Sequence, residues 1–152
     1  MINKDVPGLN RTIHATNNWL AEISDELGIP DPQLAYHALR GVLFATRDRL
    51  TVEEAMDLSA QLPTLIRGIF FEGYKPSDKP LTYRDRDPFL ERVNEELQMV
   101  DGANPEDTAQ AVFAVLNQHI SPGEIENVRR MLPKPIRQLW PSPEDETTGA
   151  AE

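Results

Sequence analysis

Apolar residues recur along the chain at intervals of three and four, the period of one face of an α-helix. Leu20, Ile23 and Leu27 follow this spacing in the first half, and Val112 and Leu116 follow it in the second. No sustained alternation of apolar and polar residues indicates a strand. The pattern predicts an all-α fold with helices over residues 12–28, 32–49, 52–61, 63–72, 88–99, 105–119, 122–131 and 133–140.

The pattern occurs twice, at an offset of 70 residues and without a gap. The offset places Leu27 on Leu97 and Arg67 on Arg137. Further identical pairs are Leu20 with Leu90, Glu26 with Glu96, Val42 with Val112, Glu54 with Glu124, Leu62 with Leu132 and Pro63 with Pro133. We therefore expect two tandem copies of a small helical unit. A unit of this size is marginal alone, so the copies should share a core as a pseudo-two-fold helical bundle.

Helix starts are marked at matching places in the two copies. Thr51 with Glu54, and Ser121 with Glu124, have the spacing of a capping box, in which each side chain accepts a hydrogen bond from the other residue's main-chain amide. An N-cap residue followed by proline at the first helical position marks further starts. These pairs are Asp31-Pro32, Asp87-Pro88 and Asn104-Pro105.

Two segments lack the helical pattern. Residues 73–86 are rich in turn formers and charges, which is typical of a linker that crosses the surface. Residues 141–152 are acidic and polar, which is typical of a disordered tail. The predicted organisation is one globular domain, with repeat 1 over residues 12–72 and repeat 2 over residues 87–140.

The charge excludes some partners. The formal net charge is −10, and no stretch forms the basic stripe that phosphate backbones require, so we expect no nucleic-acid binding. The sequence has no cysteine, which excludes disulfides and thiolate metal sites. No apolar run approaches the ~20 residues of a membrane span, so we expect no membrane partner and a cytoplasmic protein.

Residues with catalytic or metal-binding chemistry do not form a recognisable constellation. His14, His37 and His119 have no helical spacing to each other or to a carboxylate, whereas zinc needs three or four converging ligands. The serines lie in no Gly-x-Ser-x-Gly turn, and the glycines form no phosphate-binding loop. We therefore predict no catalytic residues, no metal and no cofactor, and an enzyme is the less favoured reading.

Arg67 and Arg137 are the most notable charges, because each copy places an arginine at the same point of a short apolar helix. Guanidinium groups bind carboxylate or phosphate in a bidentate way, so the two arginines are candidate anion contacts. The alternative is structural: Arg67 pairs with Glu26 or Glu54, and Arg137 pairs with the equivalent Glu96 or Glu124. We favour this alternative, because the acids are repeated together with the arginines.

Phe71 and Tyr74 belong, with Phe70, to the densest aromatic cluster of the chain. If these rings are exposed, they form an apolar patch of the kind that marks a partner site. If they lie under the linker, they belong to the core, which is the reading we favour.

The segment from Arg47 to Pro76, RDRLTVEEAMDLSAQLPTLIRGIFFEGYKP, resembles the signature of the bacterial Domain of Unknown Function 2267 family. The resemblance extends over residues 12–140 and includes a shorter echo at Leu132-Pro133 and Ile136-Arg137. It implies a bacterial, helical, internally duplicated protein and no established activity. The second copy lacks the Glu-Gly-Tyr-Lys-Pro turn after Trp140.

The leading functional hypothesis is a helical protein-interaction or scaffold module with a protein partner. The alternative is a small anionic-ligand binder or enzyme that uses the cleft between the two repeats, with Arg67 or Arg137 holding the anion. An arginine-lined pocket of ~300 Å³ or more with a converging acid or histidine would favour the alternative.

Overall fold

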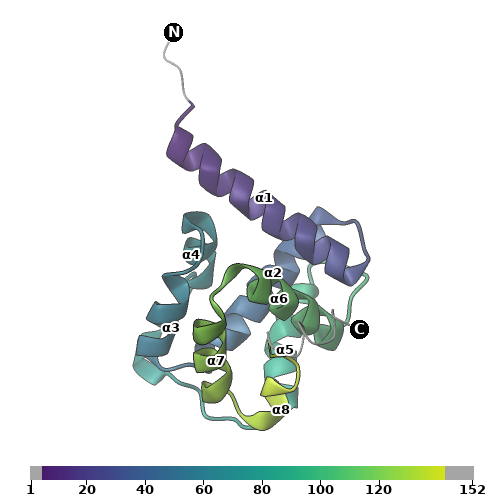
Figure 1. Ribbon diagram of the computed structural model, residues 1–152. Coiled ribbons are helices and arrows are strands. Elements are labelled where there is room, and N and C mark those ends of the chain that lie inside the picture. The colour runs from purple at the N-terminus through teal and green to yellow at the C-terminus, as the bar shows by residue number, and fades with distance from the viewer. Residues whose placement is uncertain (1–4, 143–152) are drawn as a thin grey trace.

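The computed structural model describes residues 5–142, and its regular secondary structure in that range is entirely helical, which confirms the all-α prediction (Figure 1). The elements are α1 Pro7–Leu27, α2 Pro32–Asp48, α3 Val52–Ser59, α4 Thr64–Phe70, η1 Pro76–Asp78, α5 Arg86–Leu97, α6 Pro105–His119, α7 Pro122–Met131 and α8 Lys134–Arg137. All predicted bounds but the start of α1 are met within three residues. Residues 143–152 of the predicted acidic tail lie outside the described range.

Helix α2 is central to the core and packs against α1, α4, α5 and α6 (Figure 1). Leu39, Val42 and Leu43 on this helix are fully buried. A Cβ atom added to Gly41 would lie 2.9 Å from the carbonyl oxygen of Val93 on α5. Glycine is therefore required where α2 and α5 cross, because any side chain would push their main chains apart.

Near residue 140, the last part of the described range packs into the core. The indole of Trp140 is fully buried and stacks on Phe113, with ring centroids 4.2 Å apart. Its Nε1 donates to Oδ1 of Asn117 at 2.9 Å. The predicted helix over 133–140 ends early, because the amides of Leu139 and Trp140 donate to carbonyls only three residues back, as in a 3₁₀ turn.

The predicted N-caps are met in part. The hydroxyl of Ser121 accepts from the amide of Glu124 at 3.3 Å, but the amide of Ser121 donates to Oε1 of Gln61 rather than to Glu124, so the reciprocal half of that capping box is wrong. The hydrogen bond to Gln61, just after α3, thus replaces the local bond within the capping box. The predicted Asp87 cap is also wrong, since α5 begins at Arg86 without a side-chain cap bond.

The linker after α4 is held by residues at the end of α2. Nη1 of Arg47 donates to the carbonyl oxygen of Phe70 at 2.7 Å and to that of Glu72 at 2.6 Å. Nε of Arg49 donates to the carbonyl oxygen of Tyr83 at 2.7 Å. The end of α2 therefore fixes both ends of the linker.

Helix α1 begins five residues before its predicted start, because Pro7 occupies its first turn and the helical pattern extends back through Leu9 and Ile13. Its C-terminal half packs on α2 and α6, Thr12 in its N-terminal half contacts α4, and its first turns extend beyond the other helices (Figure 1). None of the described helices combines the length and apolar character that crossing a membrane requires.

Candidate functional site

Arg67 and Arg137 make hydrogen bonds to main-chain carbonyls. Nε of Arg67 donates to the carbonyl oxygen of Ser59 at 2.9 Å, and its Nη2 donates to that of Leu62 at 3.1 Å. Nη2 of Arg137 donates to the carbonyl oxygen of Leu132 at 3.0 Å, again five residues earlier in the chain. Ser59 is the last residue of α3, and Leu62 and Leu132 come shortly after α3 and α7, where helical hydrogen-bond partners are no longer available. Both side chains thus bind main-chain carbonyls at or just after a helix end.

The prediction that these arginines pair with acids of their own copy is wrong. No ion pair in the described residues joins Arg67 to Glu26 or Glu54, or Arg137 to its predicted acids. Nε of Arg137 is buried without a hydrogen-bond partner. Carbonyl oxygens near the C-terminal end of a helix carry partial negative charge, so they can replace a carboxylate as the partner of a cation.

Phe71 and Tyr74 are half-buried at the start of the linker. The ring of Phe71 packs edge-on against fully buried Phe70, with centroids 5.0 Å apart. The guanidinium of Arg47 lies 5.5 Å from the Tyr74 ring, a cation–π contact. Burial raises the pKa of Tyr74, and its hydroxyl has no hydrogen-bond partner. The cluster is thus anchored in the core at Phe70 and is only partly exposed beyond it.

A polar cluster joins α2 to α5. Oε1 of Glu96 accepts from Nε of Arg40 at 2.7 Å and lies 3.0 Å from Nδ1 of His37, and Arg40 also pairs with Glu72. Burial opposes ionisation of Glu96, but the hydrogen bonds from His37 and Arg40 outweigh it and lower its pKa. Burial likewise opposes the charge of Arg40, and the two carboxylates raise its pKa. Within the described residues, each charged group of this cluster thus pairs with another member of the cluster.

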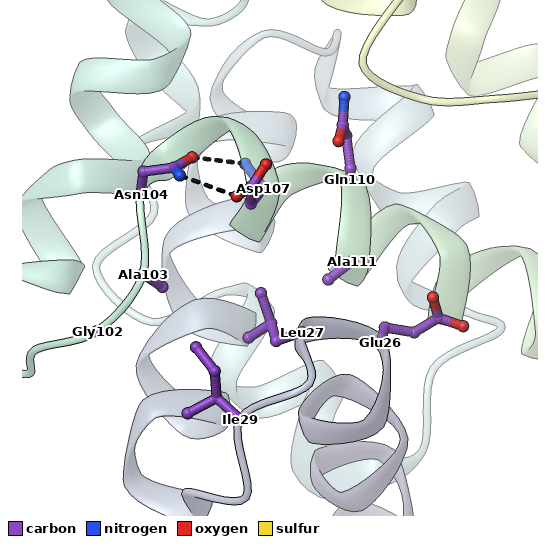
Figure 2. A pocket seen from close by; sticks show the side chains of 9 residues that line it. All are labelled: Glu26, Leu27, Ile29, Gly102, Ala103, Asn104, Asp107, Gln110 and Ala111. Atoms are coloured by element: carbon purple, nitrogen blue, oxygen red, sulfur yellow. Dashed lines mark hydrogen bonds between the residues drawn. The ribbon is translucent and has the colours of Figure 1, made fainter.

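A cavity of about 470 Å³ opens between the C-terminal end of α1 and the N-terminal half of α6 (Figure 2). Leu27, Ile29 and Ala111 supply apolar lining. Figure 2 also shows its polar side chains, which are Glu26, Asn104, Asp107 and Gln110.

Asn104 and Asp107 are held in place at this cavity by each other. Oδ1 of Asn104 accepts from the amide of Asp107 at 2.8 Å, and its Nδ2 donates to Oδ2 of Asp107 at 2.9 Å. The charged groups in the lining are Glu26 and Asp107, both acidic. A cavity of this charge disfavours anions, and neither Arg67 nor Arg137 lines it.

A second, more apolar groove of about 480 Å³ lies between the N-terminal half of α1 and α4. Leu9, Leu65 and Ile69 supply much of its apolar lining, and Tyr36 and Arg40 approach from α2. The hydroxyl of Thr12 accepts from the amide of Leu65 at 2.8 Å, which joins the start of α4 to α1. At the groove, Val6, which directly precedes α1, and Leu9 and Ile13 on α1 are exposed to 49%, 59% and 49%.

These exposed residues of α1 are absent from the set predicted from sequence. The available signal was their spacing: Val6, Leu9 and Ile13 precede Thr16 and Leu20 at alternating intervals of three and four. The predicted helix over residues 12–28 includes Ile13 but not Val6 and Leu9. No group of three or more His, Cys, Asp or Glu residues in the described range is arranged to hold a metal ion.

The family model described as "Uncharacterized conserved protein (DUF2267)" matches residues 16–139. The match covers most of the 152-residue chain, so the protein belongs to this family, and the resemblance seen in the sequence is confirmed. A search of curated proteins finds no match. The family is uncharacterised and assigns no activity, so any function has to be argued from the surfaces described above.

Proposed function

We propose that this protein is a helical protein-interaction module that binds its partner along the N-terminal half of α1 and the groove between α1 and α4. The observation that carries the proposal is the apolar stripe made by Val6, which directly precedes α1, and by Leu9 and Ile13 on the part of α1 that extends beyond the core. Apolar side chains that are scattered singly need no explanation, but a contiguous patch beside a groove is typical of a partner site.

The energetics support this site. Fully burying a Val, Leu or Ile side chain contributes about 1.5–3 kcal/mol. About half of each side chain in the stripe is exposed, so a partner gains on the order of 1 kcal/mol from each one that it covers. A helical segment that lacks tertiary packing is marginal in water. The partner would therefore also stabilise the projecting turns of α1.

We further propose that the chain is an internal duplication packed about a pseudo-two-fold axis. Helices α3 and α7 begin at Val52 and Pro122, and α4 and α8 begin at Thr64 and Lys134, an offset of 70 in both cases. In the proposed duplication, α1 is equivalent to α5, and α2 is equivalent to α6. The α2–α5 contact is then equivalent to the α6–α1 contact, and both contacts occur. The matching carbonyl bonds of Arg67 and Arg137 also support the duplication.

An anionic-ligand binder or enzyme in the cleft between the repeats receives no such support. The cavity between α1 and α6 lies where this cleft was expected, and its charged residues, Glu26 and Asp107, repel anions. The guanidinium groups of Arg67 and Arg137 are engaged by carbonyls. We place the module in the bacterial cytoplasm on the family resemblance and on the sequence without cysteine.

Site-specific photo-crosslinking in cells tests the proposed function. A benzophenone amino acid at Leu9 is expected to give discrete protein adducts. The matched control is Met99, which is even more exposed, at 72%, but lies outside the stripe and the groove. Equal adduct yields at both positions, or none at Leu9, would contradict the proposal.

A further inference from the structure

We infer that the partner at this face is a second copy of the same chain, so that two α1 helices pack antiparallel over each other's α4 in a symmetric dimer. The inference rests on the proposed function, because it assigns a partner to the same surface.

The spacing of the exposed residues indicates that the partner is a helix. Leu9 and Ile13 are four residues apart on α1, and the series continues through buried Thr16 to Leu20. A stripe restricted to this repeat is the narrow seam by which two helices pack, and it is narrower than the apolar face of a helix on a broad core.

The shape of the face is suited to a symmetric contact. The projecting half of α1 forms a ridge, and the groove lined by Leu65 and Ile69 lies directly beside it. A surface that carries both a ridge and a matching groove is self-complementary: under a two-fold rotation, each ridge enters the groove of the other copy. Such a contact closes at two copies, whereas a head-to-tail contact would continue into a ring or filament.

The charge of the face also permits self-association. The chain has a net charge of −10, so two copies repel each other over most of their surfaces. Residues 7–20 of α1 contain no acid and a single arginine, Arg11, and α4 contains no acid and a single arginine, Arg67. At the end of the groove, Arg40 forms ion pairs with Glu72 and with Glu96 on α5. The acidic surface is thus interrupted where two copies have to meet.

The size of the face indicates the class of interface that it can form. Residues 7–20 extend for about 20 Å along the helix axis. A ridge of this length with its neighbouring groove gives an interface at the small end of the specific range, on the order of 1,000 Å² in total. Interfaces at this end of the range are typical of transient complexes, so we expect a reversible dimer and not an obligate one.

Sedimentation velocity of the full chain between about 1 and 200 μM tests the inference at the concentrations expected for an interface of this size. The wild type should shift from 17.1 kDa toward twice that mass as the concentration rises. The double variant Leu9→Gln with Ile13→Gln should raise the dissociation constant at least about 30-fold, as expected when central apolar contacts are removed. Met99→Gln is the matched control, and circular dichroism verifies that each variant is folded.

A crosslinking experiment tests the same face without changing any apolar residue. The chain has no native cysteine, and Asn10 on α1 and Asn127 on α7 are both exposed. A short bis-maleimide should link copies of Asn10→Cys and should not link copies of Asn127→Cys.

The outcomes separate the inference from the proposed function. A wild type that stays monomeric to 200 μM overturns the second copy as partner, while adducts of other proteins at Leu9 in cells leave the interaction module standing. If the double variant still forms the dimer and copies of Asn127→Cys are crosslinked, the dimer uses a different face and the inferred face is wrong. Absence of both a dimer and cellular adducts overturns both.

Discussion

Glu96 on α5 accepts a hydrogen bond from the Nε of Arg40 on α2 at 2.7 Å, across 56 residues of sequence. The pair lies in the contact between the two predicted repeats, beside the point where Gly41 allows α2 and α5 to approach closely. It therefore joins two helices that are close only because the core brings them together.

Replacing Glu96 with Gln should destabilise the fold by about 1.5–3 kcal/mol at pH 7, the range for hydrogen bonds to charged groups. The folded pKa of Glu96 is below its ordinary 4.5. Its contribution is thus fully present above pH 4.5 and is lost as pH falls through the folded pKa. Urea denaturation of the wild type and the variant at pH 7 and pH 3.5 measures the difference in their free energy of unfolding. The control is Glu95→Gln, a neighbouring exposed acid, and an equal loss in both variants would contradict the prediction.

Replacing Glu124 with Gln should have the opposite effect. Burial, and then repulsion from Asp57 and Glu54, raises the pKa of Glu124, and its Oε1 is buried without a hydrogen-bond partner. Ionisation of this group therefore opposes folding as pH rises through the folded pKa. Glu124→Gln should raise the melting temperature at pH 7, and the gain should disappear near pH 4. The exposed acid in Glu91→Gln is the control, and a lower melting temperature for Glu124→Gln at pH 7 would refute the assignment.

A methyl group at Gly41 should destabilise the protein by about 1–3 kcal/mol, because the added Cβ meets the Val93 carbonyl oxygen and the two helices have to move apart. Gly123→Ala on α7 is the matched control, since nothing lies within 4 Å of its added Cβ. That variant should be neutral or stabilised by up to about 1 kcal/mol. Similar stabilities for the two variants in guanidinium titrations would mean that the α2–α5 crossing is looser than described.

Replacing Arg67 with Ala should cost about 1–2 kcal/mol through the loss of its bonds to the Ser59 and Leu62 carbonyl oxygens. Arg84→Ala, at an exposed linker position, should cost less than ~0.5 kcal/mol. Titration with phosphate and citrate provides the second measurement. An Arg67→Ala variant of unchanged stability that loses a wild-type anion affinity would overturn the structural role and revive the ligand-binding alternative.

The proposed duplication predicts the result of a grafting experiment. The residue 70 positions after Arg40 is Gln110, which lines the cavity together with Glu26, the counterpart of Glu96. Gln110→Arg should therefore form an ion pair with Glu26 and stabilise the protein by up to about 1 kcal/mol, the scale for an exposed pair. Gln110→Met, similar in length but uncharged, is the control. If both variants have the same free energy of unfolding, the correspondence between the two helix contacts fails at this position.

The sequence by itself determined the elements of secondary structure. Apolar spacing, N-cap residues and prolines act within a few residues of each other, so they locate helices such as α6 and α7 without reference to the rest of the chain. The family signature is equally local. The same reasoning misplaced the start of α1, because the helical pattern of Leu9 and Ile13 continues without any core to cover it.

Only the tertiary structure decided which side chains meet. The amide of Ser121 donates to Gln61, whereas the capping box predicts a bond to Glu124. Arg67 binds main-chain carbonyls in place of the predicted acids. His37 finds its carboxylate on another helix, 59 residues away. A long polar side chain reaches many candidate partners of similar energy, and the packing of the helices selects among them. The exposure of the α1 stripe has the same origin, since it depends on where the rest of the core ends.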